Sequence, residues 1–485
     1  MNPAEYVNET VGTPASAGGK LYYGPETQKA LSLLGNSRTP RVLIRAYGEV
    51  KLAAIYAQQE TAQLYPAGYF PVLEKTALDI IAGKYDNSFP LPLAQGGAGT
   101  SLHMNICEVL ANAANERYEA AAVQAETAGR PFPQPEFRAT PLDHLARFQS
   151  TNDTFPTAVI IMTYRFLESI ENGIIKLQEN LVEREKKYED CLICGRTELQ
   201  DALPMTLGQV YGAWAGPVER DRWRMNKLKE RLRTIPLGGT AIGTGFSAPL
   251  QYVFSAEKHL RRITKLPLCR SQNLCDAVAH TDSLAECAGG MGLCADNLYK
   301  MTNDLLLYTS SVNGELHHGE LQYGSTIMPD KVNPVILELV RGLCMDCAST
   351  AHLITDYSRS GQWQLNANLP FLTEQMIHLD DRLERALNAA NGPLMQTIAP
   401  DAAKMELHLA SSPALLNALR DILPYTKIKT LLPELRKAAP HGISGLIDFL
   451  VSHTDINRKT LEEHLDTGAL TGFSDVSEIH GRRNA

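Results

Sequence analysis

The chain has 485 residues, of which 44% are hydrophobic and 21% are charged, and these proportions are typical of a globular protein with two or three domains. Its formal net charge of −8 argues against nucleic acid or an anionic membrane surface as a partner. No apolar run is long enough to span a membrane, and residues 1–20 lack the apolar core of a signal peptide, so the cytoplasm is the expected location.

The N-terminal region is predicted to be helical after a flexible arm. Residues 1–20 are polar and rich in glycine, alanine and proline, which is typical of an arm without fixed structure. From Arg41 to Ala82 apolar residues recur at helical spacing. This pattern predicts two or three amphipathic helices.

A glycine-rich segment at residues 95–105 leads into a predicted helix at Cys107–Tyr118. Glycines let the backbone approach a ligand closely, and the start of a helix favours negative charge. By itself such a segment is more often an ordinary turn. Residues 129–139 contain three prolines and no periodicity, which predicts a loop.

Residues 149–158 (Gln-Ser-Thr-Asn-Asp-Thr-Phe-Pro-Thr-Ala) repeat the same design. Side chains that cap helices come first, then a proline, then a long apolar helix predicted from Val159 to about Leu181. These side chains could bind an anionic ligand or simply cap the helix, and the pattern alone favours the cap.

The central part of the chain is predicted to consist of long helices. Residues 195–209 precede one such helix, and the glycine-rich turn at residues 235–245 predicts close packing. Residues 270–311 and 335–360 have the strongly apolar helical pattern of buried bundle helices. The sequence shows no convincing strand pairs and no internal repeats.

A separate C-terminal module is predicted to begin near Ala403. Its last short helix is expected at Thr460–Leu465, and residues 470–485 read as a loose polar tail.

The nine cysteines are an odd number scattered along the chain, which fits reduced thiols better than a disulfide framework. Two CxxC pairs, Cys191/Cys194 and Cys344/Cys347, are too far apart for a zinc ribbon. Both pairs are predicted to be packing residues, with a metal or redox role as the alternative.

Residues 324–334 (Gly-Ser-Thr-Ile-Met-Pro-Asp-Lys-Val-Asn-Pro), here called the signature loop, combine the groups that an anionic substrate needs. Gly324 permits backbone conformations that other residues resist, and Pro334 suits the first position of a helix. The candidate binding groups are the hydroxyls of Ser325 and Thr326, the ammonium of Lys331 and the amide of Asn333.

Several of these segments resemble, in order, the motifs of the aspartase/fumarase superfamily. The signature loop matches the family signature nearly letter for letter. Residues 22–27 are similar to the family's YYGxxT, residues 95–108 to GGAGTSxNMNxNE, residues 149–158 to QSSND.FPTA, and residues 195–209 to GRTxxQDAxPxTLGQ. The likeness runs from about Tyr22 to Leu465, nearly the whole chain.

The resemblance implies an all-α fold with three helical domains: an N-terminal domain at residues 1–147, a central long-helix bundle at 148–402 and a small C-terminal domain at 403–485. Family members form homotetramers around a twenty-helix core, and each active site takes segments from three subunits. The implied partner is a small anionic substrate, either a dicarboxylate or an amino acid. No cofactor and no metal are expected.

The chemistry of the family is reversible β-elimination, in which a base removes a proton from Cβ and a group leaves from Cα. Ser325 matches the base, and the loop amides must lower its pKa because an ordinary serine is too weak. Thr197 would contact the substrate near the leaving group, and Thr326 is a second catalytic candidate. The candidate substrate-binding residues are Thr100, Ser101, Ser150, Thr151 and Asn152 for the β-carboxylate, and Lys331 and Asn333 for the other carboxylate.

Glu198 departs from the family pattern, since fumarases carry histidine there. Glu338 matches the glutamate that partners this histidine, so two carboxylates could face each other and raise at least one pKa. A substrate ammonium or His103 between them would relieve the repulsion. Alternatively, Glu198 turns to solvent or pairs with Arg196. Both glutamates and His103 are therefore candidate site residues.

Two further positions depart from the family pattern, and the first of them points away from fumarase. Residues 140–143 (Thr-Pro-Leu-Asp) replace the fumarase HPND segment. His103 replaces an asparagine, and a lone histidine near a helix start is more often structural than catalytic. Asp330 adds a negative charge to the signature loop without a clear role.

The sequence therefore favours a lyase that eliminates ammonia or an amine from aspartate or an aspartate-like substrate, giving fumarate or a related alkene acid. Fumarate hydratase is the alternative. A catalytically silent paralogue is less favoured, because the main family residues are present: Ser325, Lys331, Asn333, Thr100 and Asn152.

Overall fold

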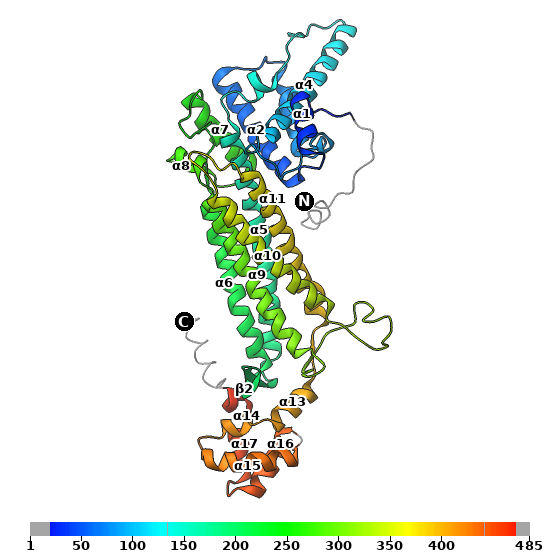
Figure 1. Ribbon diagram of the computed structural model, residues 1–485, viewed down its shortest axis with the longest axis vertical. Helices are drawn as coiled ribbons and strands as arrows, with labels where there is room; N and C mark the ends of the chain where they lie inside the picture. Colours follow the sequence, from blue (N-terminus) through cyan, green and yellow to red (C-terminus); the bar gives the residue numbers. More distant parts are fainter. Residues whose placement is uncertain (1–19, 133, 441, 472–485) are drawn as a thin grey trace. The chain divides into compact units, whose positions relative to one another are not determined.

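The computed structural model describes residues 20–132, 134–440 and 442–471, and these residues are mostly α-helical (Figure 1). The predicted all-α fold is confirmed. The predicted arm at residues 1–20 and the predicted tail at 470–485 fall almost entirely outside the described residues. None of the helices in the described ranges is long and apolar enough to cross a membrane.

The chain divides into two compact units. Unit 1 comprises Met1–Glu171, Trp223–Ala295 and Met345–Glu384, and unit 2 comprises Asn172–Arg222, Asp296–Cys344 and Arg385–Ala485. The unit boundaries fall inside the five long helices α5 (Thr151–Lys187), α6 (Leu207–Arg231), α9 (Asp282–Tyr308), α10 (Val335–Arg359) and α11 (Leu369–Ala389). The division into three domains stays a prediction.

In unit 1, helix α2 (Arg41–Ala62) forms the centre of the packing against α3 (Phe70–Ile81) and α7 (Leu250–Thr264). It is buried over most of its length, because apolar residues occupy nearly every turn. Helix α4 (Thr100–Thr127) packs against α3 and against α1 (Pro25–Leu34). The prediction of two or three amphipathic helices between residues 41 and 82 is confirmed.

Short elements complete unit 1. They are a 3₁₀ turn at Asp86–Ser88, a π-helical turn at Pro141–Leu145, helix α8 (Leu274–Ala279), and the parallel two-residue strands β3 (Thr234–Ile235) and β4 (Cys269–Arg270). The turn at residues 235–245 is tightly packed, as predicted. A methyl group on Gly238 would lie 2.4 Å from a Val253 methyl carbon, and one on Gly243 would lie 2.3 Å from the Cys275 backbone.

Helices α4 and α5 begin earlier than predicted, at Thr100 and Thr151 rather than at Cys107 and Val159. The positive φ of Gly99, 92°, ends the preceding loop directly before α4. Pro156 lies inside α5, which the prediction excluded. Capping side chains before the proline start the helix, and a proline near a helix start costs little.

Unit 2 contains an antiparallel hairpin, β1 (Leu192–Thr197) and β2 (Gln200–Thr206), so the prediction that no strands pair was wrong. Its two-residue turn places Glu198 and Leu199 at φ values of 52° and 63°. Such a turn usually carries asparagine or glycine, and the absence of both hid the hairpin from sequence analysis. A second short pair joins β5 (Leu316–His317) and β6 (Ala399–Pro400).

The C-terminal part of unit 2 has its own apolar core, to which Cys194 of β1 also contributes. The sequence predicted Thr460–Leu465 as the last helix, whereas the described residues contain one more helix after it, α18 (Thr467–Thr471). The helices are α12 (Met395–Thr397), preceded by a π-helical turn at Ala390–Leu394, α13 (Ala402–Ser411), α14 (Ala414–Ala418), α15 (Tyr425–Ala438), α16 (Gly442–His453), α17 (Arg458–His464) and α18 (Thr467–Thr471).

All nine cysteines are free thiols, as predicted from their number and spacing. Cys344 and Cys347 are buried on α10, and Cys194 is buried on β1. Burial raises the pKa of the Cys344 thiol to about 12, so this thiol stays protonated and packs as a small apolar group.

Candidate active site

The signature loop folds so that the Ser325 hydroxyl faces two backbone amides of its own loop. The N–H groups of Ile327 and Met328 donate hydrogen bonds to Ser325 Oγ over 3.2 Å and 3.0 Å. Hydrogen bonds to a charged form favour that form. These two donors would therefore favour a serine alkoxide over the alcohol, and the role of Ser325 as the base stays a prediction.

The base of the loop is closed by Asn333 and Gly324. Asn333 Nδ2 donates to the Gly324 carbonyl over 2.6 Å. A Cβ atom on Gly324 would lie 1.6 Å from the Lys331 carbonyl oxygen, so only glycine fits. The close approach, rather than an unusual backbone angle, explains this glycine.

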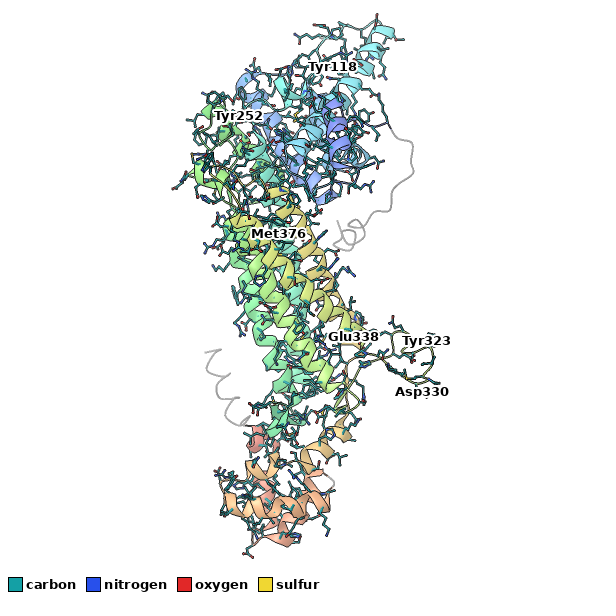
Figure 2. The ribbon with its side chains drawn as sticks, in the orientation of Figure 1. Tyr118, Tyr252, Tyr323, Asp330, Glu338 and Met376 are labelled. Carbon is teal, nitrogen blue, oxygen red and sulfur yellow. The ribbon has the colours of Figure 1, made fainter. Side chains whose placement is uncertain are left out.

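The loop stands away from helix α10, whose first turn carries Glu338 (Figure 2). Tyr323 is 91% exposed and Ile327 is 84% exposed, and Lys331 is exposed as well. Asp330 has a φ of 62°, a conformation that aspartate tolerates better than most residues. This backbone role accounts for the Asp330 that the sequence left unexplained. Helix α10 begins one residue after Pro334, close to the predicted start.

The 149–158 motif forms a capping box at the start of α5. Ser150 Oγ accepts the N–H of Asn152 over 3.2 Å, and Asp153 Oδ1 accepts the N–H of Ser150 over 2.9 Å. Asp153 also holds a turn far away in sequence, since its Oδ2 accepts the N–H groups of Gly238 and Thr240 over 3.1 Å and 3.0 Å. Burial raises the pKa of Asp153 to about 6, against the opposing effect of these three amides.

We expect Asp153→Ala to lower the free energy of unfolding by roughly 3–5 kcal/mol, because it leaves three backbone donors without their acceptor in a buried place. Chemical denaturation of the purified protein measures this loss. Asp143→Ala is the matched control: its carboxylate also accepts a bond at a helical turn, from Thr140 Oγ1, but it is exposed. A loss in Asp153→Ala no larger than that of the control would contradict this role.

The other candidates of unit 1 lie at the starts of α4 and α5. His103 is buried, and its Nδ1 lies 2.9 Å from Thr151 Oγ1. Asn152 Nδ2 donates to the Ala241 carbonyl over 2.8 Å, which ties the motif to the glycine-rich turn. Thr100 Oγ1 donates to the Gly97 carbonyl over 2.9 Å and is exposed, and the next residue, Ser101, is half-buried.

Thr197 and Glu198 lie at the exposed tip of the β1–β2 hairpin in unit 2. The suggested pairing of Glu198 with Arg196 is wrong, because Arg196 binds other carboxylates. It makes two hydrogen bonds to Glu315, of 2.8 Å and 2.7 Å, and one to Asp201 of 3.1 Å. His408 of α13 also hydrogen-bonds to Glu315. The hydrogen bonds from Arg196 to Glu315 raise the pKa of Arg196 and hold the hairpin in place.

The suggestion that His103 lies between Glu198 and Glu338 is also wrong. Both ring nitrogens of His103 are already engaged within unit 1, Nδ1 with Thr151 and Nε2 with Lys51 Nζ at 2.6 Å. A histidine with both nitrogens occupied cannot bridge two further carboxylates.

Each unit thus assembles a distinct set of candidate residues. Unit 1 brings together His103 and Thr151, with Ser150 and Asn152 beside them in sequence and Thr100 and Ser101 at the start of α4. Unit 2 brings together Ser325, Thr326, Lys331 and Asn333 in one loop, with Glu338 after it and Thr197 and Glu198 on the hairpin.

Two functional features were not predicted from the sequence: the buried Lys51, and the hydrogen bonds by which Asp153 holds the backbone amides of Ser150, Gly238 and Thr240. The signal for Lys51 was its place on the apolar face of α2, with Tyr47 four residues before it and Ile55 four residues after it. For Asp153 the signal was the three-residue spacing from Ser150 that defines a capping box.

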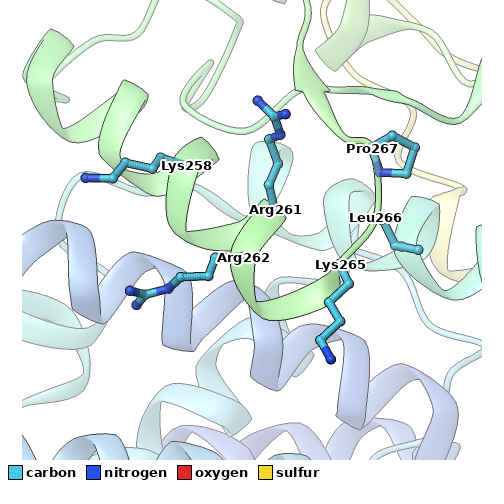
Figure 3. Close-up of a pocket in the computed structure, with 6 residues that line it drawn as sticks. All are labelled: Lys258, Arg261, Arg262, Lys265, Leu266 and Pro267. Atoms are coloured by element: carbon cyan, nitrogen blue, oxygen red, sulfur yellow. The ribbon is translucent and has the colours of Figure 1, made fainter.

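A basic cavity of about 500 Å³ on α7 is not a candidate site. Figure 3 shows that its four cationic side chains point in different directions instead of converging on one point: Lys258, Arg261, Arg262 and Lys265. A ligand site needs converging polar groups. In the described part of the chain, no group of three or more histidine, cysteine, aspartate or glutamate residues is arranged to hold a metal ion.

The described residues are therefore mostly α-helical. Two backbone amides donate to Ser325 Oγ in the signature loop, and the 149–158 motif forms a capping box at the start of α5. A family model described as Lyase matches residues 38–348 of the chain. The chain belongs to the aspartase/fumarase superfamily of lyases.

Relatives with two different activities match the chain about equally well. An aspartate ammonia-lyase of Bacillus subtilis is 30% identical over 84% of this chain and 84% of its own length. A class II fumarate hydratase of Thermus thermophilus is 31% identical over 86% of this chain and 88% of its own length.

Solved structures agree on the fold. A fumarate lyase:delta crystallin from Brucella melitensis bound to cobalt matches with a TM-score of 0.82 and 29% identity, covering 92% of this chain and 95% of its own. A class II fumarase from Schistosoma mansoni matches with a TM-score of 0.80 over 92% of this chain and 94% of its own. At 22% identity, the second match supports the fold alone.

Proposed function

We propose that the protein is an ammonia- or amine-eliminating lyase that acts on aspartate or an aspartate-like substrate and releases fumarate or a related alkene acid. The observation that carries this proposal is the pair of amides, from Ile327 and Met328, that donate to Ser325 Oγ. A serine in this setting can act as the base that β-elimination needs.

In the proposed mechanism Ser325 removes a proton from Cβ, the β-carboxylate takes up the electron pair as a doubly charged aci form, and ammonia or an amine leaves from Cα. Stabilising that aci form is the largest electrostatic demand. We assign the β-carboxylate to Thr100, Ser101, Ser150, Thr151 and Asn152, the second carboxylate to Lys331 and Asn333, and the region of the leaving group to Thr197 and Thr326.

Glu198 favours ammonia or an amine over water as the leaving group. Its carboxylate stands where fumarases carry histidine, and it is exposed at the hairpin tip without a cationic partner of its own among the described residues. A substrate ammonium would provide that charge, with Glu338 as the second carboxylate. Fumarate hydratase is the alternative, supported by the relative from Thermus thermophilus.

We further propose a homotetramer whose active sites combine segments from three copies. Large apolar side chains that a single copy leaves in water support this assembly: besides Tyr323 and Ile327 of the signature loop, Met345 of α10 is 55% exposed and Leu293 of α9 is 50% exposed. Light scattering should therefore give about four times the chain mass of 53.3 kDa.

The test is turnover of L-aspartate and of L-malate by the purified protein, followed by the ultraviolet absorbance of fumarate and by ammonia release. Fumarate and ammonia from aspartate alone would establish an aspartate ammonia-lyase. Turnover of malate alone would overturn the proposal in favour of fumarate hydratase. Silence with both substrates would restrict the proposal to substituted aspartates, which the same assay then tests.

We expect Glu198→Gln to raise the KM for aspartate about 10-fold, the size of one charge-assisted hydrogen bond, and to leave the KM for malate unchanged. Glutamine keeps the shape of the side chain and removes only its charge. Glu219→Gln, at an exposed position on α6, controls for the change in net charge. Equal effects on both substrates would remove Glu198 from recognition of the amine.

A further inference from the structure

A lysine lies fully buried beside the candidate substrate-binding residues of unit 1. Lys51 of α2 is 0% exposed, which is rare for lysine unless its charge is paired. Its Nζ lies 2.6 Å from His103 Nε2, 2.9 Å from Gln149 Oε1 and 3.2 Å from the Leu145 carbonyl oxygen. None of these three partners is a carboxylate. Burial lowers the pKa of Lys51, while the neighbouring Cys107 thiol and Asp153 oppose this shift and favour the ammonium.

The surrounding hydrogen bonds fix which of these atoms accept. Gln149 Nε2 donates to the carbonyls of Leu145 and Arg147, so its Oε1 is left to accept from Lys51. The Leu145 carbonyl can only accept. An ammonium has only protons to offer and no lone pair, so its 2.6 Å contact with His103 requires a lone pair on Nε2.

This assignment determines the rest of the chain of hydrogen bonds. With a lone pair on Nε2, neutral His103 carries its proton on Nδ1 and donates it to Thr151 Oγ1 over 2.9 Å. Burial and the nearby Lys51 charge hold the pKa of His103 well below its usual value, which keeps the ring neutral. Thr151 Oγ1 then accepts from His103, and its own proton is free.

Thr151 is the first residue of α5 and is 7% exposed. Within the described ranges, His103 is the one hydrogen-bond partner of its hydroxyl. A buried hydroxyl that has its acceptor site filled and its proton unused is set to donate to an incoming acceptor. Under the proposed function, that acceptor would be an oxygen of the substrate carboxylate.

We propose that Lys51 and His103 are positioning residues that hold Thr151 as a hydrogen-bond donor to a substrate carboxylate. We call this chain the Lys51–His103–Thr151 relay. The inference rests on the proposed function, since that function supplies the carboxylate. The relay also explains why His103 can replace the family's asparagine. The Nδ1–H group of His103 donates to Thr151 as an asparagine amide would.

The relay has an electrostatic consequence. All its protons point the same way, from the Lys51 ammonium through His103 toward Thr151, and hydrogen bonds aligned in this way polarise one another. The buried charge of Lys51 thereby strengthens the Thr151 donor without touching the substrate. A donor of this kind serves the doubly charged aci form more than the ground-state carboxylate.

Two substitutions of His103 separate the relay from a structural role. Asparagine places an amide N–H near the position of Nδ1 and keeps the donor to Thr151, whereas glutamine places its Oε1 near the position of Nε2 and keeps only the acceptor for Lys51. Succinate, an unreactive dicarboxylate, reports binding. For His103→Asn we expect the Kd of succinate and the KM of aspartate to stay within about 3-fold of the wild-type values. For His103→Gln we expect both constants to rise about 10-fold. The opposite order would overturn the relay.

A double-mutant cycle with Thr151→Val gives a second, independent criterion. Thr151→Val should raise the succinate Kd about 10-fold, and His103→Gln in that background should add less than about 2-fold, because the relay acts through Thr151. If the two substitutions instead raise the succinate Kd by the product of their separate effects, the relay is overturned. Thr151→Ser keeps the hydroxyl and should bind succinate like the wild type. This variant tests the hydroxyl even if the valine variant folds poorly.

The controls separate this inference from the proposed function. His259 is another buried histidine of unit 1, bonded through Nε2 to Glu60 over 2.7 Å. His259→Asn and His259→Gln should change thermal stability without changing succinate binding. If the wild-type protein binds succinate but turns over no aspartate, malate or substituted aspartate, the proposed function fails, and the double-mutant cycle on succinate binding still tests the relay. Failure to bind any dicarboxylate would overturn both.

Discussion

Replacing Ser325 with alanine is expected to lower kcat for aspartate about 1000-fold and to leave KM within a few-fold, as loss of a general base does. The reason is local, since two backbone N–H groups donate to the oxygen of Ser325. Alanine has no oxygen that could accept these bonds or take the substrate proton. Binding of the two carboxylates is assigned to other residues, so affinity should persist. Steady-state kinetics on the purified protein measures both constants.

Ser310→Ala is the matched control for this substitution. Ser310 Oγ also accepts a backbone N–H, from Asn313 over 3.3 Å, but it lies outside the signature loop in the same unit. Its loss should leave kcat unchanged. A Ser325→Ala variant as active as this control would remove Ser325 from the mechanism and with it the central argument for the proposed function.

The candidate site was predictable where chemistry depends on residue type in a short stretch of chain. In the signature loop, Ser325 and Asn333 are nine residues or fewer from the groups that they bond, Met328 and Gly324. The sequence therefore contained the whole arrangement. The loop's glycine was predicted for the wrong reason, because the close approach of the Lys331 carbonyl to Gly324 is a three-dimensional fact that no spacing reveals.

The parts that escaped prediction depend on contacts between distant segments. Lys51 and His103 are separated by 52 residues, and a lysine in an amphipathic helix is normally taken for a surface residue. Asp153 reaches Gly238 across 85 residues. The hairpin was missed for a different reason, since its turn residues, Glu198 and Leu199, adopt positive φ values that their side chains disfavour.

Strain at Glu198 and Leu199 is itself informative. Two adjacent residues other than glycine or asparagine at positive φ cost of order 1–3 kcal/mol each, and such costs persist where the surroundings fix the conformation. The buried pairing of Arg196 with Glu315 provides that constraint directly beside the turn. The hairpin tip thus presents Glu198 in a defined place even though it is exposed.

The second large effect is expected from Gly324→Ala, which should abolish turnover to the same degree as Ser325→Ala, about 1000-fold, while leaving the fold intact. The added methyl group would lie 1.6 Å from the Lys331 carbonyl oxygen, a distance that forces the two sides of the loop apart. The hydrogen bond from Asn333 to the Gly324 carbonyl would then break.

Loss of that closure moves Ser325 away from its two amide donors. An alkoxide at Ser325 then loses their stabilisation, and the base is lost although its side chain is present. The loop is exposed, so thermal unfolding should change little, which distinguishes Gly324→Ala from a folding defect. Gly392→Ala, where nothing lies within 4 Å of the added atom, should keep full activity. If Gly324→Ala also keeps it, Ser325 does not need the closed loop, and the two amide donors are not what makes it a base.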